Sequence, residues 1–292
     1  MALRPAERLP SCGPAERPPL PPLPGGGRMI VWPVLFLEHW DIARPMARTV
    51  ITPPSGPSLL PDVPNWTWHE YGMRAGFWRL HRLFHELGIG PTVSLNSSVC
   101  GTHPAVVEAC LSSGWELSAH AVEQVPMHLV EDERATIERC LDEIEAFAGT
   151  RPRGWSGPGL TQTLDTLDHL AHAGIEYVGD WVLDDEPVRV RAGDGELVAL
   201  PYTFELHDIV MMNLQHHPSA ELVHRARAAF DCLHEESRER PKVMALALHP
   251  YLSGQPHRIG AVRAVLDLVR GHDDVLVWDG VTILDWFAGA AL

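Results

Sequence analysis

Six polar side chains able to act as acids, bases or hydrogen-bonding groups each follow an apolar segment of the chain. They are Glu38, Asn96, His120, Asp180, Tyr202 and His249. Carboxylates and imidazoles transfer protons near neutral pH, and they are also common ligands of divalent metals. If the apolar segments are parallel strands, their carboxyl ends converge on one face and bring these groups into one pocket. The pattern therefore predicts an acid–base or metal site.

The segment Val243–Leu248 is the clearest of these strands. It is apolar throughout, without alternation, which is typical of a strand buried on both faces of a parallel sheet. The strand ends at His249, because Pro250 cannot extend a hydrogen-bonded ladder. A histidine at the mouth of such a strand is well placed for chemistry. A structural histidine paired inside the core explains His249, taken alone, equally well.

Strand-like and helical segments alternate from Met29 onward. Strands are predicted at Ile30–Leu37, Thr92–Leu95, Trp115–Ala119, Tyr177–Gly179, Val198–Leu200, Val243–Leu248 and Val275–Val277, with helices between them, as at Phe77–Leu87 and Glu131–Phe147. This alternation implies parallel pairing through right-handed crossovers. About seven or eight strands predict an α/β fold in which the sheet closes, or nearly closes, into a barrel. Residues 29–292 are expected to form this single domain.

Two segments do not fit the alternation. Residues 1–28 are rich in Pro, Gly and Arg without a periodic apolar pattern, which predicts a disordered tail. Translation starting at Met29 would lose no predicted element. The loop Arg44–Trp68 is longer than an ordinary connection, which suggests a functional segment such as a lid.

The composition indicates the class of partner. A formal net charge of −15 over 292 residues disfavours nucleic acid and anionic membranes as partners. No apolar run reaches the roughly 18 residues of a membrane span. The five cysteines include no Cys-x-x-Cys pair, which argues against a disulfide framework or a structural zinc site. A cytoplasmic protein acting on a small molecule is expected.

Five stretches of the chain form a recognisable set. They are HEYGMRAGFWR (His69–Arg79), WELSAH (Trp115–His120), RPRGWSGPG (Arg151–Gly159), EYVGDWVLDDEP (Glu176–Pro187) and LALHPY (Leu246–Tyr251). Together they resemble the polysaccharide deacetylase, or NodB-homology, superfamily, and most of all its allantoinase-like and cyclic-imide-hydrolase-like branch. The resemblance implies a distorted (β/α) barrel, hydrolysis of a non-peptide carbon–nitrogen bond, and a homo-oligomer.

The resemblance also implies roles for residues of the pocket. The acidic residue that ends the first strand of the family corresponds to Glu38. The first histidine of the family's metal-binding pair corresponds to His120, while Gln124 stands where the second belongs. The family's general acid, which protonates the leaving group, corresponds to His249.

Further residues are expected around these groups. By resemblance, Asp180 and Trp181 belong to the motif that packs against and orients the acid histidine. Substrate contacts are predicted for Glu70, at the rim of the pocket, and for Asn96, Trp155, Trp181 and Tyr202. Aromatic walls around a few polar groups suit a planar or ring-shaped substrate.

The exchange of an imidazole for the amide of Gln124 removes a strong metal ligand. The site is therefore expected to hold either no metal or one weakly bound zinc on Glu38, His120 and Gln124. Without a metal, His120 or Glu38 would act as the base on water, and His249 would protonate the leaving nitrogen. The predicted function is hydrolysis of an amide or cyclic amide. The alternatives are a metal-dependent N-deacetylase of an acetylated amino sugar and a non-catalytic small-molecule-binding barrel.

Overall fold

The computed structural model describes residues 3–10, 17–57 and 59–289. Its strands are β1 (Met29–Leu37), β2 (Thr92–Leu95), β3 (Leu117–Ala119), β4 (Gly154–Trp155), β5 (Tyr177–Val178), β6 (Val188–Ala192), β7 (Gly195–Ala199), β8 (Lys242–Leu248) and β9 (Val275–Val277). Its helices are α1 (Pro5–Arg8), α2 (Val63–Tyr71), α3 (Phe77–Leu87), α4 (Val99–Thr102), α5 (Pro104–Ser112), α6 (Glu133–Ala148), α7 (Thr166–His172), α8 (Ala220–Glu236), α9 (Pro250–Ser253), α10 (Ile259–Arg270) and α11 (Gly280–Phe287). Single helical turns are η2 (Pro24–Gly26), η3 (Gly72–Gly76), η4 (Met127–Leu129), η5 (Pro158–Leu160) and η6 (Ile209–Leu214).

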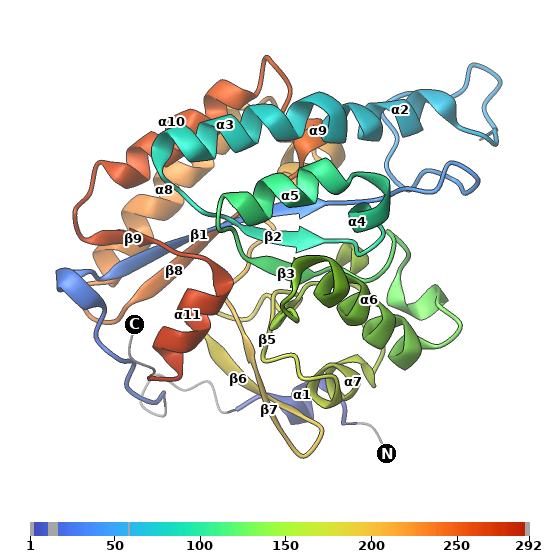
Figure 1. Cartoon of the computed structure of the whole chain (residues 1–292). Coiled ribbons are helices and arrows are strands. Elements are labelled where there is room, and N and C mark those ends of the chain that lie inside the picture. The colour runs from blue at the N-terminus through green and yellow to red at the C-terminus, as the bar shows by residue number, and fades with distance from the viewer. Residues whose placement is uncertain (1–2, 11–16, 58, 290–292) are drawn as a thin grey trace.

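The strands form one curled sheet in the order β6-β7-β5-β4-β3-β2-β1-β8, with β9 paired to β1. Neighbouring strands run parallel except β6 and β7, which form an antiparallel pair. The sheet curls into a half-barrel, and most of the long helices cover its outer face (Figure 1). The predicted distorted (β/α) barrel is confirmed. Sequence patterning identified only the second strand of the β6/β7 pair.

Strand β1 is buried on both faces, which explains its continuous apolar sequence. Its residues alternate between two clusters. Ile30, Trp32, Val34 and Phe36 pack on the inner, concave face, while Met29, Val31, Leu35 and Leu37 pack beneath the helices. Side chains two residues apart point to the same side of a strand. Glu38 therefore continues the inner row, directly after Phe36.

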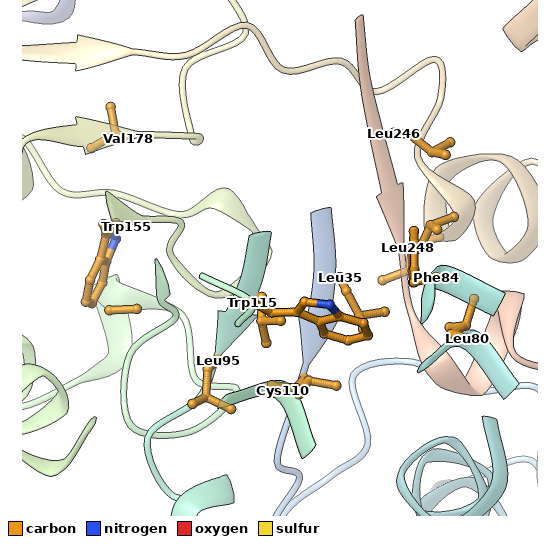
Figure 2. Close-up of a cluster of buried hydrophobic side chains, with 14 of the residues drawn as sticks. Leu35, Leu80, Phe84, Leu95, Cys110, Trp115, Trp155, Val178, Leu246 and Leu248 are labelled. Atoms are coloured by element: carbon orange, nitrogen blue, oxygen red, sulfur yellow. The ribbon is translucent and has the colours of Figure 1, made fainter. Parts of the chain in front are cut away.

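Helix α3 shows how the outer face is covered. Its buried residues recur at helical spacing and include Leu80 and Phe84, which belong to the same core cluster as Leu35 and Leu248 (Figure 2). The helix ends at Gly88, whose φ of 65° lies in the left-handed region that favours glycine. The sequence predicted both the helix and its end correctly.

Two glycines let α2, η3 and α3 pack directly on the segment that follows His249. A Cβ atom at Gly76 would lie 2.0 Å from the carbonyl oxygen of Pro250, and one at Gly72 would lie 2.6 Å from the backbone nitrogen of Tyr251. Only residues without a side chain allow this approach. The contact holds the end of β8 against the helical layer.

The long loop before α2 is attached to that helix by Asn65. The buried Asn65 side chain accepts hydrogen bonds from the backbone of Val50 and Ile51 at 2.8 and 3.1 Å. Trp66 donates to the carbonyl oxygen of Trp40 at 2.9 Å. The loop and α2 are thereby fixed beside the end of β1.

The expectation of a disordered tail over residues 1–28 is wrong for residues 3–10 and 17–28; residues 1–2 and 11–16 lie outside the described ranges. The reason is Arg8, which is fully buried against the body of the protein. Its guanidinium donates to both carboxylate oxygens of Asp168, at 2.6 and 2.9 Å, and to the carbonyl oxygens of Arg191 and Leu164. Because these partners lie far along the chain, the composition of the tail itself does not reveal them.

Replacing Arg8 by alanine is expected to lower the free energy of unfolding by about 2 kcal/mol, because charge-assisted hydrogen bonds are lost and Asp168 is left unpaired. Urea denaturation measures the change. The control Arg238→Ala removes an ion pair to Glu235 in which both side chains are 63% exposed, and it should change stability by less than about 0.5 kcal/mol. Equal effects of the two substitutions would contradict a structural role for the tail.

Candidate functional site

Glu38, His120 and His249 meet at the carboxyl ends of β1, β3 and β8. The Oε1 atom of Glu38 lies 3.5 Å from Nε2 of His249 and 3.9 Å from Nε2 of His120. All three side chains are at least 97% buried. The structure therefore gathers the three predicted central residues around one carboxylate oxygen.

The carboxylate of Glu38 is surrounded by hydrogen-bond donors. Gln124 donates its side-chain N–H to Oε1 at 2.8 Å, while Trp40 and Tyr251 donate to Oε2 at 3.2 and 3.4 Å. Burial raises the pKa of Glu38, but the positive charge of His249 and the closeness of both histidine rings outweigh it and hold the pKa well below its usual range. Glu38 is therefore a carboxylate at neutral pH.

His120 has an unpaired ring nitrogen on the side of Glu38. Its Nδ1 donates to the carbonyl oxygen of Ser156, so in the neutral ring Nε2 carries a lone pair. This Nε2 is buried and has no hydrogen-bond partner among the described residues. The Asn96 side chain donates to the backbone carbonyl of His120 and accepts from the backbone N–H of His39 at 2.8 Å. Both ends of the amide are thus used internally, and Asn96 positions the site instead of contacting a substrate as predicted.

His249 is held by a buried carboxylate that the sequence did not single out. Its Nδ1 lies 2.7 Å from Oδ1 of Asp208, and its backbone N–H donates to Oδ2 at 2.6 Å. Ser253 also donates to Oδ2, at 2.6 Å. Burial lowers the pKa of His249, but the charges of Asp208 and Glu38 outweigh this and raise the pKa to about 9. His249 therefore carries a proton on Nε2 at neutral pH.

Replacing Asp208 by asparagine is expected to move the alkaline limb of the pH profile of kcat/KM from near pH 9 to lower pH. Without the negative charge, the His249 imidazolium loses its proton more readily, and the protonated form is the active one. Rates across the pH range measure the shift. Asp142→Asn, on an exposed side chain, is the control and should leave the profile in place, while an unmoved limb in Asp208→Asn would contradict this assignment.

The predicted orienting role of Asp180 is not what the structure shows. Its carboxylate accepts the backbone N–H of Gly157 at 2.8 and 3.0 Å and the side chain of Gln162 at 2.7 Å. Burial raises the pKa of Asp180 to about 7. Trp181 donates to the same Gln162 at 2.7 Å. Asp180 and Trp181 therefore fix the loop after β4, and Asp208 takes the place beside His249.

The remaining predicted substrate contacts fall in three different environments. Trp155 is fully buried in the outer-face core (Figure 2), because it points away from the inner row, and its contact with a substrate stays a prediction. Glu70 is paired with His103 at 3.2 Å, which lowers its pKa. Tyr202 has a buried hydroxyl without a hydrogen-bond partner among the described residues.

Sequence reasoning missed three further residues at the site. Asp208 and its neighbour His207 follow no predicted strand, so nothing in the local pattern placed them at the rim. His69 packs between Trp40 and Tyr251, with ring centroids 4.6 and 4.4 Å away, and its buried Nε2 is unpaired within the described chain. The only signal for His69 was its position at the start of one family-like motif.

A divalent metal does not fit the position that the resemblance gives it. Gln124 donates an amide N–H to Oε1 of Glu38. This hydrogen-bond donor lies where a metal ion bound to Glu38 and Gln124 would have to lie. The imidazolium of His249, 3.5 Å away, already balances the carboxylate. The ligand-type atoms of His207, Asp208 and His249 lie within 4.8 Å of one another, but Asp208 is saturated by its three hydrogen bonds.

Part of the chain matches a known protein family. Residues 67–178 match the family model for polysaccharide deacetylase. A curated Schizosaccharomyces pombe protein assigned by name to the polysaccharide deacetylases is 29% identical over 230 residues, or 71% of each chain.

Solved structures share the fold of almost the whole chain. PuuE allantoinase superimposes with a TM-score of 0.82 and 23% identity, over 95% of this chain and 96% of the other. A Pseudomonas aeruginosa PAO1 protein assigned by name to the polysaccharide deacetylases gives a TM-score of 0.83 with 24% identity over the same shares. The resemblance seen in the sequence is thus confirmed: residues 67–178 match the polysaccharide deacetylase model, and almost the whole chain shares the (β/α) barrel fold of these structures.

Proposed function

We propose that this protein hydrolyses a non-peptide carbon–nitrogen bond of an amide or cyclic amide by general acid–base catalysis. The supporting observation is that the carboxylate of Glu38 lies between two imidazoles, one suited to act as a base and the other as an acid. His120 offers an unpaired Nε2, while His249 has a pKa raised to about 9. A free base nitrogen and a protonated acid on either side of one carboxylate are what amide hydrolysis requires.

In the first step His120 acts as the base. Its Nε2 takes a proton from water as the water oxygen forms a bond to the carbonyl carbon, and the carbonyl π electrons move to the oxygen. Glu38, 3.9 Å from that Nε2, stabilises the imidazolium that results. Because both oxygens of Glu38 are already hydrogen-bonded, His120 is favoured over Glu38 as the base.

In the second step His249 acts as the acid. The carbon–oxygen double bond forms again, the carbon–nitrogen bond breaks, and the nitrogen takes the proton from Nε2 of His249. Asp208 keeps that ring in place through its contact with Nδ1, at 2.7 Å. Each proton transfer of this kind contributes roughly 10²–10⁴-fold to the rate, which suffices for an activated substrate such as a strained or electron-poor ring.

The donor set around Glu38 supports a reaction that needs no resident metal. A zinc ion bound at the family's site would polarise the carbonyl and activate water. Here Gln124 donates a hydrogen bond to the Glu38 carboxylate, and the charge of His249 balances it.

Among residues 3–10, 17–57 and 59–289, every helix is too short or too polar to span a membrane. A cytoplasmic setting and a homo-oligomer stay predictions.

Turnover of allantoin, succinimide and N-acetylglucosamine oligomers, each measured with and without a chelator, tests the proposal. Hydrolysis of a ring amide that survives chelation is expected. Activity on the acetylated sugar that disappears with the chelator and returns with zinc would favour a metal-dependent N-deacetylase. Binding of a panel compound without turnover would favour the non-catalytic barrel.

A further inference from the structure

His207 lies at the same rim as the acid and the base. It pairs with Ala247 in a parallel β-bridge, so it lies beside the end of β8. Its ring stacks on His249 with a centroid distance of 5.2 Å and on Phe36 at 6.1 Å. The side chain is 10% exposed, more than the side chains of Glu38 or His249.

The hydrogen bonding of His207 fixes its tautomer. The backbone N–H of Ile209 donates to Nδ1 at 3.2 Å, so the ring proton must be on Nε2. Asp208 is 3.9 Å from Nδ1, which is too far for a hydrogen bond. Nε2 has no hydrogen-bond partner among the described residues, so its N–H is available to a bound molecule.

The ring is also held neutral. Burial and the positive charge of His249 lower the pKa of His207, while Asp208 and Glu38 raise it, and the net result is a pKa of about 3. A neutral imidazole cannot compete with His249 as a source of protons. It can only donate a hydrogen bond through Nε2.

Tyr202 supplies a second donor on the same side. Its ring lies 6.0 Å from that of His207 and 6.4 Å from Phe36, and its buried hydroxyl is unpaired within the described residues. Buried polar atoms without partners are rare and call for an explanation. The Tyr202 ring therefore packs against the His207 ring and carries a second unpaired donor.

We propose that His207, with Tyr202, forms the oxyanion site, in which the Nε2–H of His207 donates to the substrate's carbonyl oxygen as that oxygen becomes negative. The inference deepens the proposed function and rests on it. His207 would thereby polarise the carbonyl by hydrogen bonding, which is the task that a metal ion performs as a Lewis acid. The residues around Glu38 do not fit such a metal ion. Its N–H bond stays intact throughout, since the transferred protons belong to water, His120 and His249.

Kinetics of two substitutions on succinimide test the catalytic role. His207→Phe keeps the stacked ring but removes the donor, and it is expected to lower kcat by roughly 10²–10³-fold with KM nearly unchanged. His207→Gln places an amide N–H near the former Nε2 and should recover at least part of that loss. The control His234→Phe removes a histidine that also stacks on a phenylalanine, Phe230, at 5.2 Å, and should leave kcat unchanged.

The tautomer can be tested without any activity. In protein labelled with ¹⁵N-histidine, the ring signals that His207→Phe removes should belong to a neutral imidazole protonated on Nε2 across neutral pH. A charged ring, or one protonated on Nδ1, would overturn the inference even in an active enzyme. Equal kcat for His207→Phe and wild type would overturn it as well. The proposed function would instead be rejected if the wild-type protein hydrolysed neither allantoin, succinimide nor N-acetylglucosamine oligomers, while the NMR spectra still showed a neutral His207 protonated on Nε2.

Discussion

Replacing His249 by alanine is expected to lower kcat on the hydrolysed ring amide by roughly 10²–10⁴-fold. The leaving nitrogen then departs without a proton from Nε2, the atom that lies 3.5 Å from Glu38. The loss should be smaller for substrates whose nitrogen is weakly basic, such as a p-nitroanilide, because those leaving groups need less protonation. Steady-state kinetics on a matched pair of substrates measures this difference.

The alanine variant also leaves Asp208 buried without its cation, which costs stability. His249→Gln is the variant that separates the two effects, because its amide can still donate to Asp208 but supplies no transferable proton. Thermal unfolding close to wild type together with the same large drop in kcat is expected. A variant that keeps more than about one tenth of the wild-type rate would be inconsistent with general acid catalysis of the stated size.

Replacing His120 by alanine is expected to lower kcat by a similar factor, roughly 10²–10⁴-fold. The reason is the loss of the unpaired Nε2 that lies 3.9 Å from Glu38. Added imidazole should restore part of the rate, because the space left by the ring adjoins the carboxylate.

His128→Asn is the matched control for this experiment. It changes an exposed histidine eight residues along the chain, and its kcat should equal that of wild type. If His120→Ala kept its rate while Glu38→Gln lost activity, the base would be the carboxylate. If neither lost activity, the site assignment would be rejected.

The sequence identified the parts of the site that depend on local pattern. Runs such as Val243–Leu248 mark strands because both faces of a parallel sheet are buried, and the residue after each run lies at the common rim. Glu38, His120 and His249 were found in this way. The same reasoning predicted helix α3 and its end at Gly88.

Contacts between distant parts of the chain decided which carboxylate orients His249. The family-like motif suggested Asp180 for His249, but the segment 206–208 runs beside the end of β8 and brings Asp208 to Nδ1. No strand-like pattern precedes Asp208, so its place at the rim depends on a bridge between residues about forty positions apart. The role of Asp180 in fixing Gly157 likewise depends on how two loops meet.

The amino-acid sequence by itself determined most of the strands, the alternation with helices and the residues at those strand ends, since these follow from periodicities of a few residues. Only the folded chain decided that Trp155 faces the outer core, that Arg8 ties the tail to Asp168, and that His207 keeps a free Nε2–H. These outcomes depend on curvature of the sheet and on partners far away in the chain. Local spacing carries no information about either.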